Sequence, residues 1–270
     1  MPVLESSGIK TWQWRNQKQT LLEYAFWLAL LLLMFACAKF IADRTTWGFV
    51  LDAPRQGREM LSRGVPPRWD YMSQLWRPLW DTLTIATLGT ALSFVISVPV
   101  AFLAARNTTP NLLVRYIALF IIVGTRSVNS LIWALILVVV LGPGVLSGTL
   151  AIALRSVGFM GKLIYEGIEE INEEPVEAIR STGASGAQVL SYAIWPQVIT
   201  NILGVTIYRW DINLRESTVV GLVGAGGIGL QLDASINTLR WNQVSMILLV
   251  IFVSVFISEW ISAKARQALT

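Results

Sequence analysis

Long uncharged apolar runs alternate along the chain with short polar segments. The first run, residues 21–42, has about the 20 residues that a helix needs to cross a bilayer, and its charged residues, Glu23 and Lys39, lie near its ends. Further runs complete about six predicted transmembrane helices, over residues 79–105, 127–141, 146–168, 196–214 and 241–258. The pattern therefore predicts an all-α polytopic membrane protein.

The segments between the runs are predicted to lie outside the hydrocarbon. Residues 1–20 are polar, and we expect a surface helix or an unstructured tail there, followed by a transmembrane domain over 21–270. Residues 43–79 hold six arginines and several prolines and glycines, which predicts an irregular loop with a short helix around 56–62. A short run over 112–123 contains Arg115, and it either follows the interface or leads into the next helix.

A polar segment over residues 162–196 separates the fourth and fifth predicted helices. Its cluster of acidic residues consists of Glu173, Glu174 and Glu177. Pro175 suits the first turn of a short helix, and Gly183 can take the left-handed conformation that ends one. Ser185 can cap a second helix, and Pro196 can begin the next element. The sequence therefore predicts a helix–turn–helix outside the membrane.

Glu177-Ala178-Ile179, followed by Gly183 and Pro196, resembles the "EAA" loop of ABC-importer permeases, in which E-A-A precedes a glycine and a segment ending in I-x-L-P. The positions that depart from this pattern are Ile179, Ala193 and Trp195. The flanking segments 162–166, 208–218 and 223–229 resemble the permease subunit of phosphonate and phosphite importers. This resemblance covers roughly residues 80–265.

The resemblance implies a type I ABC-importer permease fold in the cytoplasmic (inner) membrane, with both termini in the cytoplasm. It also implies a homodimer in the lipid bilayer, two ATP-binding subunits that hold ATP and Mg, and an extracytoplasmic solute-binding protein, whereas this chain would bind no cofactor. The cargo would be phosphonate, phosphite or a related oxyanion, moved by alternating access. Residues 172–188 would form the coupling loop. Its implied ATPase-coupling residues are Glu173, Glu174, Glu177, Ala178, Ile179, Gly183, Ala184 and Ser185.

Alternatives remain open at this level. Residues 172–188 are also compatible with an ordinary cytoplasmic connection. The cargo of an importer permease can be another small solute, such as an amino acid, and an ion-gradient secondary transporter or channel would need no ATPase. The basic residues do not settle the orientation, because the loop over 43–79 is external in the implied topology and its six arginines violate the positive-inside tendency.

Composition narrows the function classes. Hydrophobic residues make up 54% of the chain and charged residues 14%, against about 25% charged in a soluble domain. Histidine is absent, which removes the commonest general base and metal ligand, and the single Cys37 allows no intramolecular disulfide. No G-x-x-x-x-G-K-[ST] occurs, so the energy must come from a partner or an ion gradient. The net charge of +4 is spread among loops, which argues against a nucleic-acid partner. We therefore expect no catalytic residue and no metal site.

Ionisable residues within the predicted helices mark a candidate substrate pathway, because their exposure to hydrocarbon is costly. Arg155 either faces a cavity suited to an oxyanion or reaches toward the headgroups. Asp211 and Arg215 are four residues apart on one helix face, so they either pair structurally or contact the substrate. Arg126 either faces the inner mouth or anchors a helix end. The candidates for the pathway or a gate are Arg126, Ser127, Asn129, Arg155, Arg209, Asp211, Asn213, Arg215, Glu216, Gly226 and Gly227.

Residues 224–229 match G-x-G-x-x-G. A dinucleotide site would also need a preceding buried strand and an acidic residue about 20 positions further on, but Asp233 comes too early and Glu259 too late. We therefore reject a nucleotide site. We expect instead a non-helical backbone that packs closely or lines a cavity at the external mouth, as part of an outer gate.

Overall fold

The computed structural model of the protein describes residues 3–6, 9–12 and 17–269. The chain divides into two compact units, Met1–Glu59 and Met60–Thr270. In the first unit, β1 (Val3–Ser6) pairs antiparallel with β2 (Ile9–Trp12), and Val3 lies opposite Trp12. The expected surface helix or unstructured tail is thus a hairpin in its described part, formed by residues such as Val3, Ile9 and Trp12 that favour strands.

The first unit continues with α1 (Gln17–Arg44), a helix of 28 residues that contains the first predicted span. Its large apolar side chains are exposed, as Leu28 and Phe35 illustrate at 61% and 70%, which suits a helix surrounded by lipid. α2 (Trp47–Gly64) runs through the division between the units. The predicted short helix around 56–62 lies within α2, and the prediction was wrong for residues 47–55, which are helical and not irregular. Pairs four residues apart, Gln56 with Asp52 and Arg55 with Glu59, support the helix although Pro54 lies within it.

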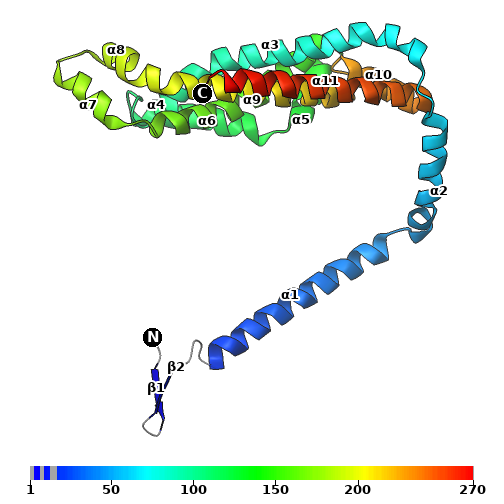
Figure 1. The fold of residues 1–270 in the computed structure, drawn as a ribbon, viewed down its shortest axis with the longest axis horizontal. Coiled ribbons are helices and arrows are strands. Elements are labelled where there is room, and N and C mark those ends of the chain that lie inside the picture. The colour runs from blue at the N-terminus through cyan, green and yellow to red at the C-terminus, as the bar shows by residue number, and fades with distance from the viewer. Residues whose placement is uncertain (1–2, 7–8, 13–16, 270) are drawn as a thin grey trace. The chain divides into compact units, whose positions relative to one another are not determined.

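The second unit is a bundle of helices, drawn in Figure 1 as an elongated body. Its elements are η1 (Trp69–Tyr71), α3 (Met72–Ala104), α4 (Leu112–Ser127), α5 (Ser130–Leu141), α6 (Val145–Glu169), α7 (Glu173–Ser181), α8 (Gly186–Val189), the π-helical turn η2 (Leu190–Ile194), α9 (Trp195–Gly221), α10 (Ile228–Asn237) and α11 (Trp241–Gln267). α3, α6, α9 and α11 run along the body, with α7 and α8 at one end and α10 at the other (Figure 1). The predicted polar segment and the glycine-rich segment therefore lie at opposite ends of the bundle.

Among the described residues, four helices have the length and apolar composition to cross a membrane: α1, η1 with α3, α8 through α9, and α11. α4 and α5 qualify as a fifth only as one bent pair, with an angle of 88° between them. The predicted third span over 127–141 was therefore wrong as a separate straight crossing, because the 12 residues of α5 reach about 18 Å and the hydrocarbon is about 30 Å thick. α6 has 25 residues, enough length for the predicted fourth span, but carries several charges.

Small residues allow the helices around α6 to approach closely. A Cβ added to Gly89 of α3 would lie 2.9 Å from Cγ2 of Ile152 on α6. A Cβ added to Gly158 of α6 would lie 2.5 Å from the carbonyl oxygen of Ile122 on α4. Such glycines are typical of helix packing in membranes, where backbones approach without a bulky side chain between them. α6 is thereby fixed against α3 and α4, which positions its polar face toward α5 and α9.

Candidate functional site

The predicted helix–turn–helix is present at one end of the bundle, and its local chemistry is as predicted. Asn172 caps α7, its side-chain oxygen accepting the N–H of Glu174 at 3.1 Å, and Pro175 lies in the first turn. Gly183 follows α7 with φ of 78°, in the left-handed region. Ser185 then caps α8, its N–H donating to Oε1 of Gln188 at 2.8 Å.

The second helix of this pair is not the separate short helix that the sequence predicted. Residues Gly186–Gly221 form one continuous helix of 36 residues, in which the π-helical turn η2 joins α8 to α9. Pro196 lies in the first turn of α9, where the missing N–H of proline is tolerated, and it does not mark a break. α8 is therefore connected to the bundle by a helix without a break.

The coupling residues implied by the resemblance gather on the surface of α7 and the following turn. Val176 is 7% exposed and anchors α7 in the core, together with Val189 and Ile194. The exposed members of the implied set are Glu173, Glu174, Glu177, Ala178, Gly183 and Ser185, and the half-buried ones are Ile179 and Ala184. An open hollow of about 470 Å³, lined by residues of the turn such as Gly183 and Ala184, lies beside them. The exposed residues of α7 and the following turn therefore form a surface that a partner can contact, supported by the buried Val176, Val189 and Ile194.

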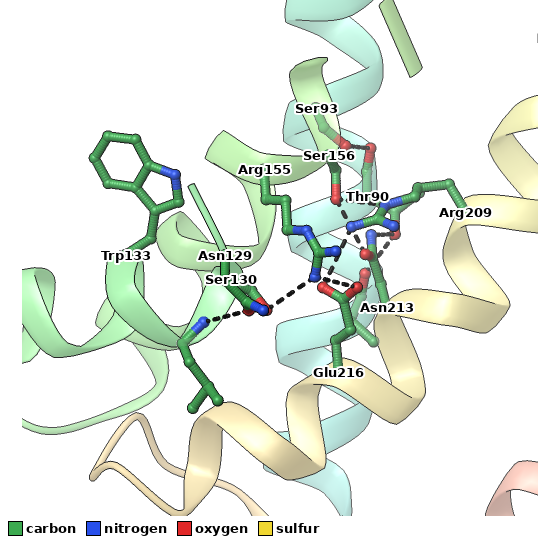
Figure 2. A network of polar contacts seen from close by, with 12 residues as sticks. Thr90, Ser93, Asn129, Ser130, Trp133, Arg155, Ser156, Arg209, Asn213 and Glu216 are labelled. Atoms are coloured by element: carbon green, nitrogen blue, oxygen red, sulfur yellow. Dashed lines mark hydrogen bonds and ion pairs between the residues drawn. The ribbon is translucent and has the colours of Figure 1, made fainter. Parts of the chain in front are cut away.

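A network of charged and polar side chains lies between α5, α6 and α9 (Figure 2). Glu216 of α9 accepts from two arginines, from Nη1 of Arg155 at 2.8 Å and from Nη2 of Arg209 at 3.3 Å. Nη1 of Arg155 also donates to Oγ of Ser130 on α5 at 3.3 Å. Glu216 is therefore a counterion of Arg155, whose side chain stays 32% exposed. Two guanidinium charges and one carboxylate leave a formal charge of +1 in this network.

Neutral groups continue the network toward α3. Nε of Arg209 donates to Oγ of Ser156 at 2.9 Å, and Ser156 donates to Oδ1 of Asn213 at 3.0 Å. Nδ2 of Asn213 donates to Oγ1 of Thr90 at 2.8 Å. The guanidinium of Arg209 also lies 4.9 Å from the ring centroid of Phe159, within cation–π range. These hydrogen bonds give partners to polar groups that are buried in the bundle. Burying such groups without a partner would cost free energy.

Asp211 and Arg215 form the ion pair that their spacing predicted. Asp211 is 5% exposed, and its Oδ1 also accepts the hydroxyl of Ser258 on α11 at 2.9 Å. The pair thus connects α9 to α11, on contacts separate from those of Glu216. The carboxylate of Asp211 is thus neutralised within the protein, while the side chain of Arg215 is 49% exposed.

The candidates at the start of the third predicted run divide into two groups. Asn129 caps α5, accepting the N–H of Leu131 at 3.1 Å, and Ser130 donates to it at 3.2 Å, which places Asn129 one hydrogen bond away from a partner of Arg155. Arg126 and Ser127 are exposed at the end of α4. The hydroxyl of Ser127 donates to the carbonyl of Gly124 at 2.8 Å. Among the described residues, no hydrogen bond connects Arg126 or Ser127 to the network of Arg155 and Glu216.

The glycine-rich turn between α9 and α10 is packed closely, as expected. Gly226 and Gly227 are buried and have φ of 83° and 74°. A Cβ added to Gly227 would lie 2.6 Å from Oγ1 of Thr82, which accepts the N–H of Ile228 at 2.8 Å. The N–H of Gly144 donates to the carbonyl of Gly224 at 3.1 Å. These contacts hold the turn against α3 and the start of α6, at the end of the bundle away from α7.

Sequence reasoning missed the neutral members of the network, chiefly Ser130, Ser156 and Thr90. One signal was available. Thr90, Ser93 and Ser97 recur at helical spacing within an otherwise apolar run, which places three hydroxyls on one face of α3. Outside their own helix, Thr90 accepts from Asn213, 123 residues away, and Ser93 donates to the sulfur of Met160, 67 residues away, so the pattern alone did not identify the network.

One family model decides the class of protein. It is described as the inner membrane component of binding-protein-dependent transport systems, and it matches residues 97–267. The chain belongs to this family. It is the multi-pass transmembrane subunit of an ABC importer of the inner membrane and is not catalytic on its own, and the family description implies an ATPase and a binding protein as partners. Within the residues that the structure describes, no group of three or more metal-ligating side chains occurs.

Relatives and solved structures agree with this assignment. The chain is 44% identical over 208 residues to the phosphite transport system permease protein PtxC of Stutzerimonas stutzeri, covering 77% of this chain and 76% of PtxC. It is 41% identical over 210 residues to the phosphate-import permease protein PhnE of Mycolicibacterium smegmatis, covering 78% of this chain and 40% of PhnE. Its fold matches a chain of the inward-facing MetNI methionine ABC transporter with a TM-score of 0.66 at 20% identity, covering 75% of this chain and 99% of that one. The last match shows the type I importer fold alone.

Proposed function

We propose that this permease imports phosphite, a phosphonate or a related oxyanion. The observation that carries the proposal is the 44% identity to a permease named for phosphite transport, together with 41% identity to one named for phosphate import. The network of Arg155, Arg209 and Glu216 supports it independently, because its formal charge of +1 suits an anionic cargo. An amino acid cargo has weaker support, since the identity to the probable D-methionine transport system permease protein MetI of Vibrio cholerae is 27% over 161 residues.

The mechanism we propose is alternating access by a homodimer of this chain. An extracytoplasmic binding protein delivers the anion, and two ATP-binding subunits, which hold ATP and Mg, dock on the coupling segment 172–188. Closure of the ATPase dimer moves α7 and α8, and the continuous helix Gly186–Gly221 carries this motion into the bundle. The cavity opens outward to receive the anion, and hydrolysis returns it to the inward-open state. This chain needs no cofactor for these steps.

The proposed roles of the remaining residues follow from where they lie. The exposed acids of α7 contact the ATPase, and Gly183 forms the joint. Arg155 and Glu216 line the pathway within the bundle, and the buried Arg209 and Asn213 support them from within the network. Gly226 and Gly227, at the end away from α7, form part of an outer gate. In this orientation α7 and both termini are cytoplasmic, and residues 1–20 precede the transmembrane domain over 21–270.

The test is uptake by the reconstituted complex. The permease is placed in vesicles with its ATPase and binding protein, and uptake of phosphite, methylphosphonate, inorganic phosphate and methionine is measured with and without ATP. We expect ATP-dependent uptake of at least one phosphorus oxyanion and none of methionine. Uptake of methionine alone would overturn the proposed cargo. Uptake that follows an ion gradient without ATP would overturn the mechanism.

A further inference from the structure

We propose that Arg155 is the residue that binds the transported oxyanion, and that Glu216 is a built-in counterion whose place at Arg155 the substrate takes. The inference rests on the proposed function and adds to it the exchange of one anion for another. Arg155, Glu216 and Arg209 form the two ion pairs on which the exchange depends, and Figure 2 shows them side by side.

The guanidinium of Arg155 has one edge left for a ligand. Both of its hydrogen bonds with described residues, to Ser130 and to Glu216, start from Nη1. An arginine carries five N–H donors, so Nε and Nη2 retain theirs among the described residues. The N–H groups of Nε and Nη2 lie parallel along one edge of the guanidinium plane. Two parallel donors of this kind match two oxygens of a phosphonate or phosphite.

Accessibility separates the two arginines that share Glu216. The side chain of Arg155 is 32% exposed, whereas that of Arg209 is 2% exposed. Arg209 is also held by Oγ of Ser156 and by the ring of Phe159. A solute that reaches the bundle therefore meets Arg155, and Arg209 stays behind as the fixed charge that retains Glu216.

An anion on the Nε–Nη2 edge and Glu216 on Nη1 would share one guanidinium, and the repulsion between their like charges favours the exchange. With Glu216 shared, the network has a formal charge of +1, and one bound monoanion brings this to zero. Glu216 can release Nη1 of Arg155 through Oε1 and still accept from Arg209 through Oε2, so neither arginine nor the carboxylate is left unpaired. This matters because an uncompensated charge in a membrane bundle is costly. Once the anion leaves, Glu216 returns to Arg155, and the empty site again has its internal counterion.

The exchange is tested by equilibrium binding to the permease–ATPase complex in detergent, with labelled phosphite, methylphosphonate or inorganic phosphate as the ligand. Substitutions of the two partners of one ion pair should change the anion affinity in opposite directions. Arg155→Gln should weaken binding about 10- to 100-fold, the range for loss of hydrogen bonds to a charged group. Arg155→Lys keeps the charge without the parallel donors and should give an intermediate affinity. Glu216→Gln removes the competing carboxylate and should tighten binding several-fold.

Two further variants keep the test decisive. Because Glu216→Gln leaves Arg209 without a carboxylate and can disturb folding, Glu216→Asp is measured too: it keeps the charge for Arg209 on a side chain one methylene shorter, and it should also tighten binding. Arg115→Gln is the matched control, since Arg115 is 16% exposed and pairs at 3.7 Å with Glu169, 14 residues further along α6 than Arg155. Its anion affinity should equal that of the wild type.

The outcomes separate this inference from the function on which it rests. Wild-type affinity in Arg155→Gln, or weaker binding in both the Arg155 and the Glu216 variants, would overturn the exchange and leave a structural ion pair. A wild-type complex that binds and transports none of the three anions would overturn the proposed function, and this inference with it.

Discussion

The turn between α7 and α8 depends on one glycine, and its replacement tests how force enters the bundle. Gly183 has φ of 78°, and a Cβ added there would meet no atom within 4 Å. The cost of Gly183→Ala is therefore the backbone cost alone, about 1–2 kcal/mol for an L-residue in the left-handed region. This energy corresponds to a factor of about 5–30 in the population of the native turn.

Gly186 offers a matched control three residues further on. It is the first residue of α8, its φ is not positive, and an added Cβ would again meet no atom within 4 Å. Gly186→Ala should therefore leave the turn intact, and in the helix alanine is favoured over glycine by about 0.5–1 kcal/mol. Gly183→Asn should fall between the two, because asparagine tolerates the left-handed region better than alanine.

The assay is the amount of oxyanion taken up per ATP hydrolysed in vesicles that contain the complete transporter. If the turn transmits the motion of the ATPase, Gly183→Ala should lower this ratio by up to the same factor of about 5–30. Gly186→Ala should keep the wild-type ratio. Equal coupling in Gly183→Ala, Gly186→Ala and the wild type would refute the reasoning, because the strained turn would then have no part in coupling.

Other predictions concern packing, the network and the partner surface. Gly158→Ala places a Cβ 2.5 Å from the carbonyl oxygen of Ile122 and should destabilise the detergent-solubilised protein by about 1–3 kcal/mol in thermal unfolding. Gly124→Ala, with no atom within 4 Å of its Cβ, should unfold like the wild type, and equal losses in both would contradict the packing argument. Asn213→Ala breaks two buried hydrogen bonds and should cost about 1–3 kcal/mol in the same experiment, whereas an unchanged transition would mean that water replaces them. Glu177→Lys reverses an exposed charge and should reduce the ATPase recovered with the permease in a pull-down, and full recovery would remove Glu177 from the contact surface.

Features fixed by local chemistry were predictable from the sequence. The end of α7 shortly before Gly183 and the cap of α8 at Ser185 each depend on a few neighbouring residues. The pair of Asp211 with Arg215 follows from a spacing of four residues on one helix. In these cases the interaction partners lie within one or two turns of each other, so a pattern of residue types is sufficient.

Features that depend on partners distant in the sequence were not predictable from it. Arg155 is paired with Glu216, 61 residues away, and only the packing of α6 against α9 brings them together. Pro196 looked like the start of a new element, yet the π-helical turn before it allows the helix to continue. The bend of 88° between α4 and α5 also escaped prediction, because the run at 127–141 has no proline or glycine and only the cap residue Asn129 marks the break.

The central claim is that this chain is a moving pore whose energy comes from a separate ATPase. The most direct measurement is oxyanion uptake into vesicles that contain the permease and binding protein, with the ATPase subunit and ATP present or omitted one at a time. The account predicts accumulation only when both are present. Equal uptake without nucleotide or without the ATPase would contradict it.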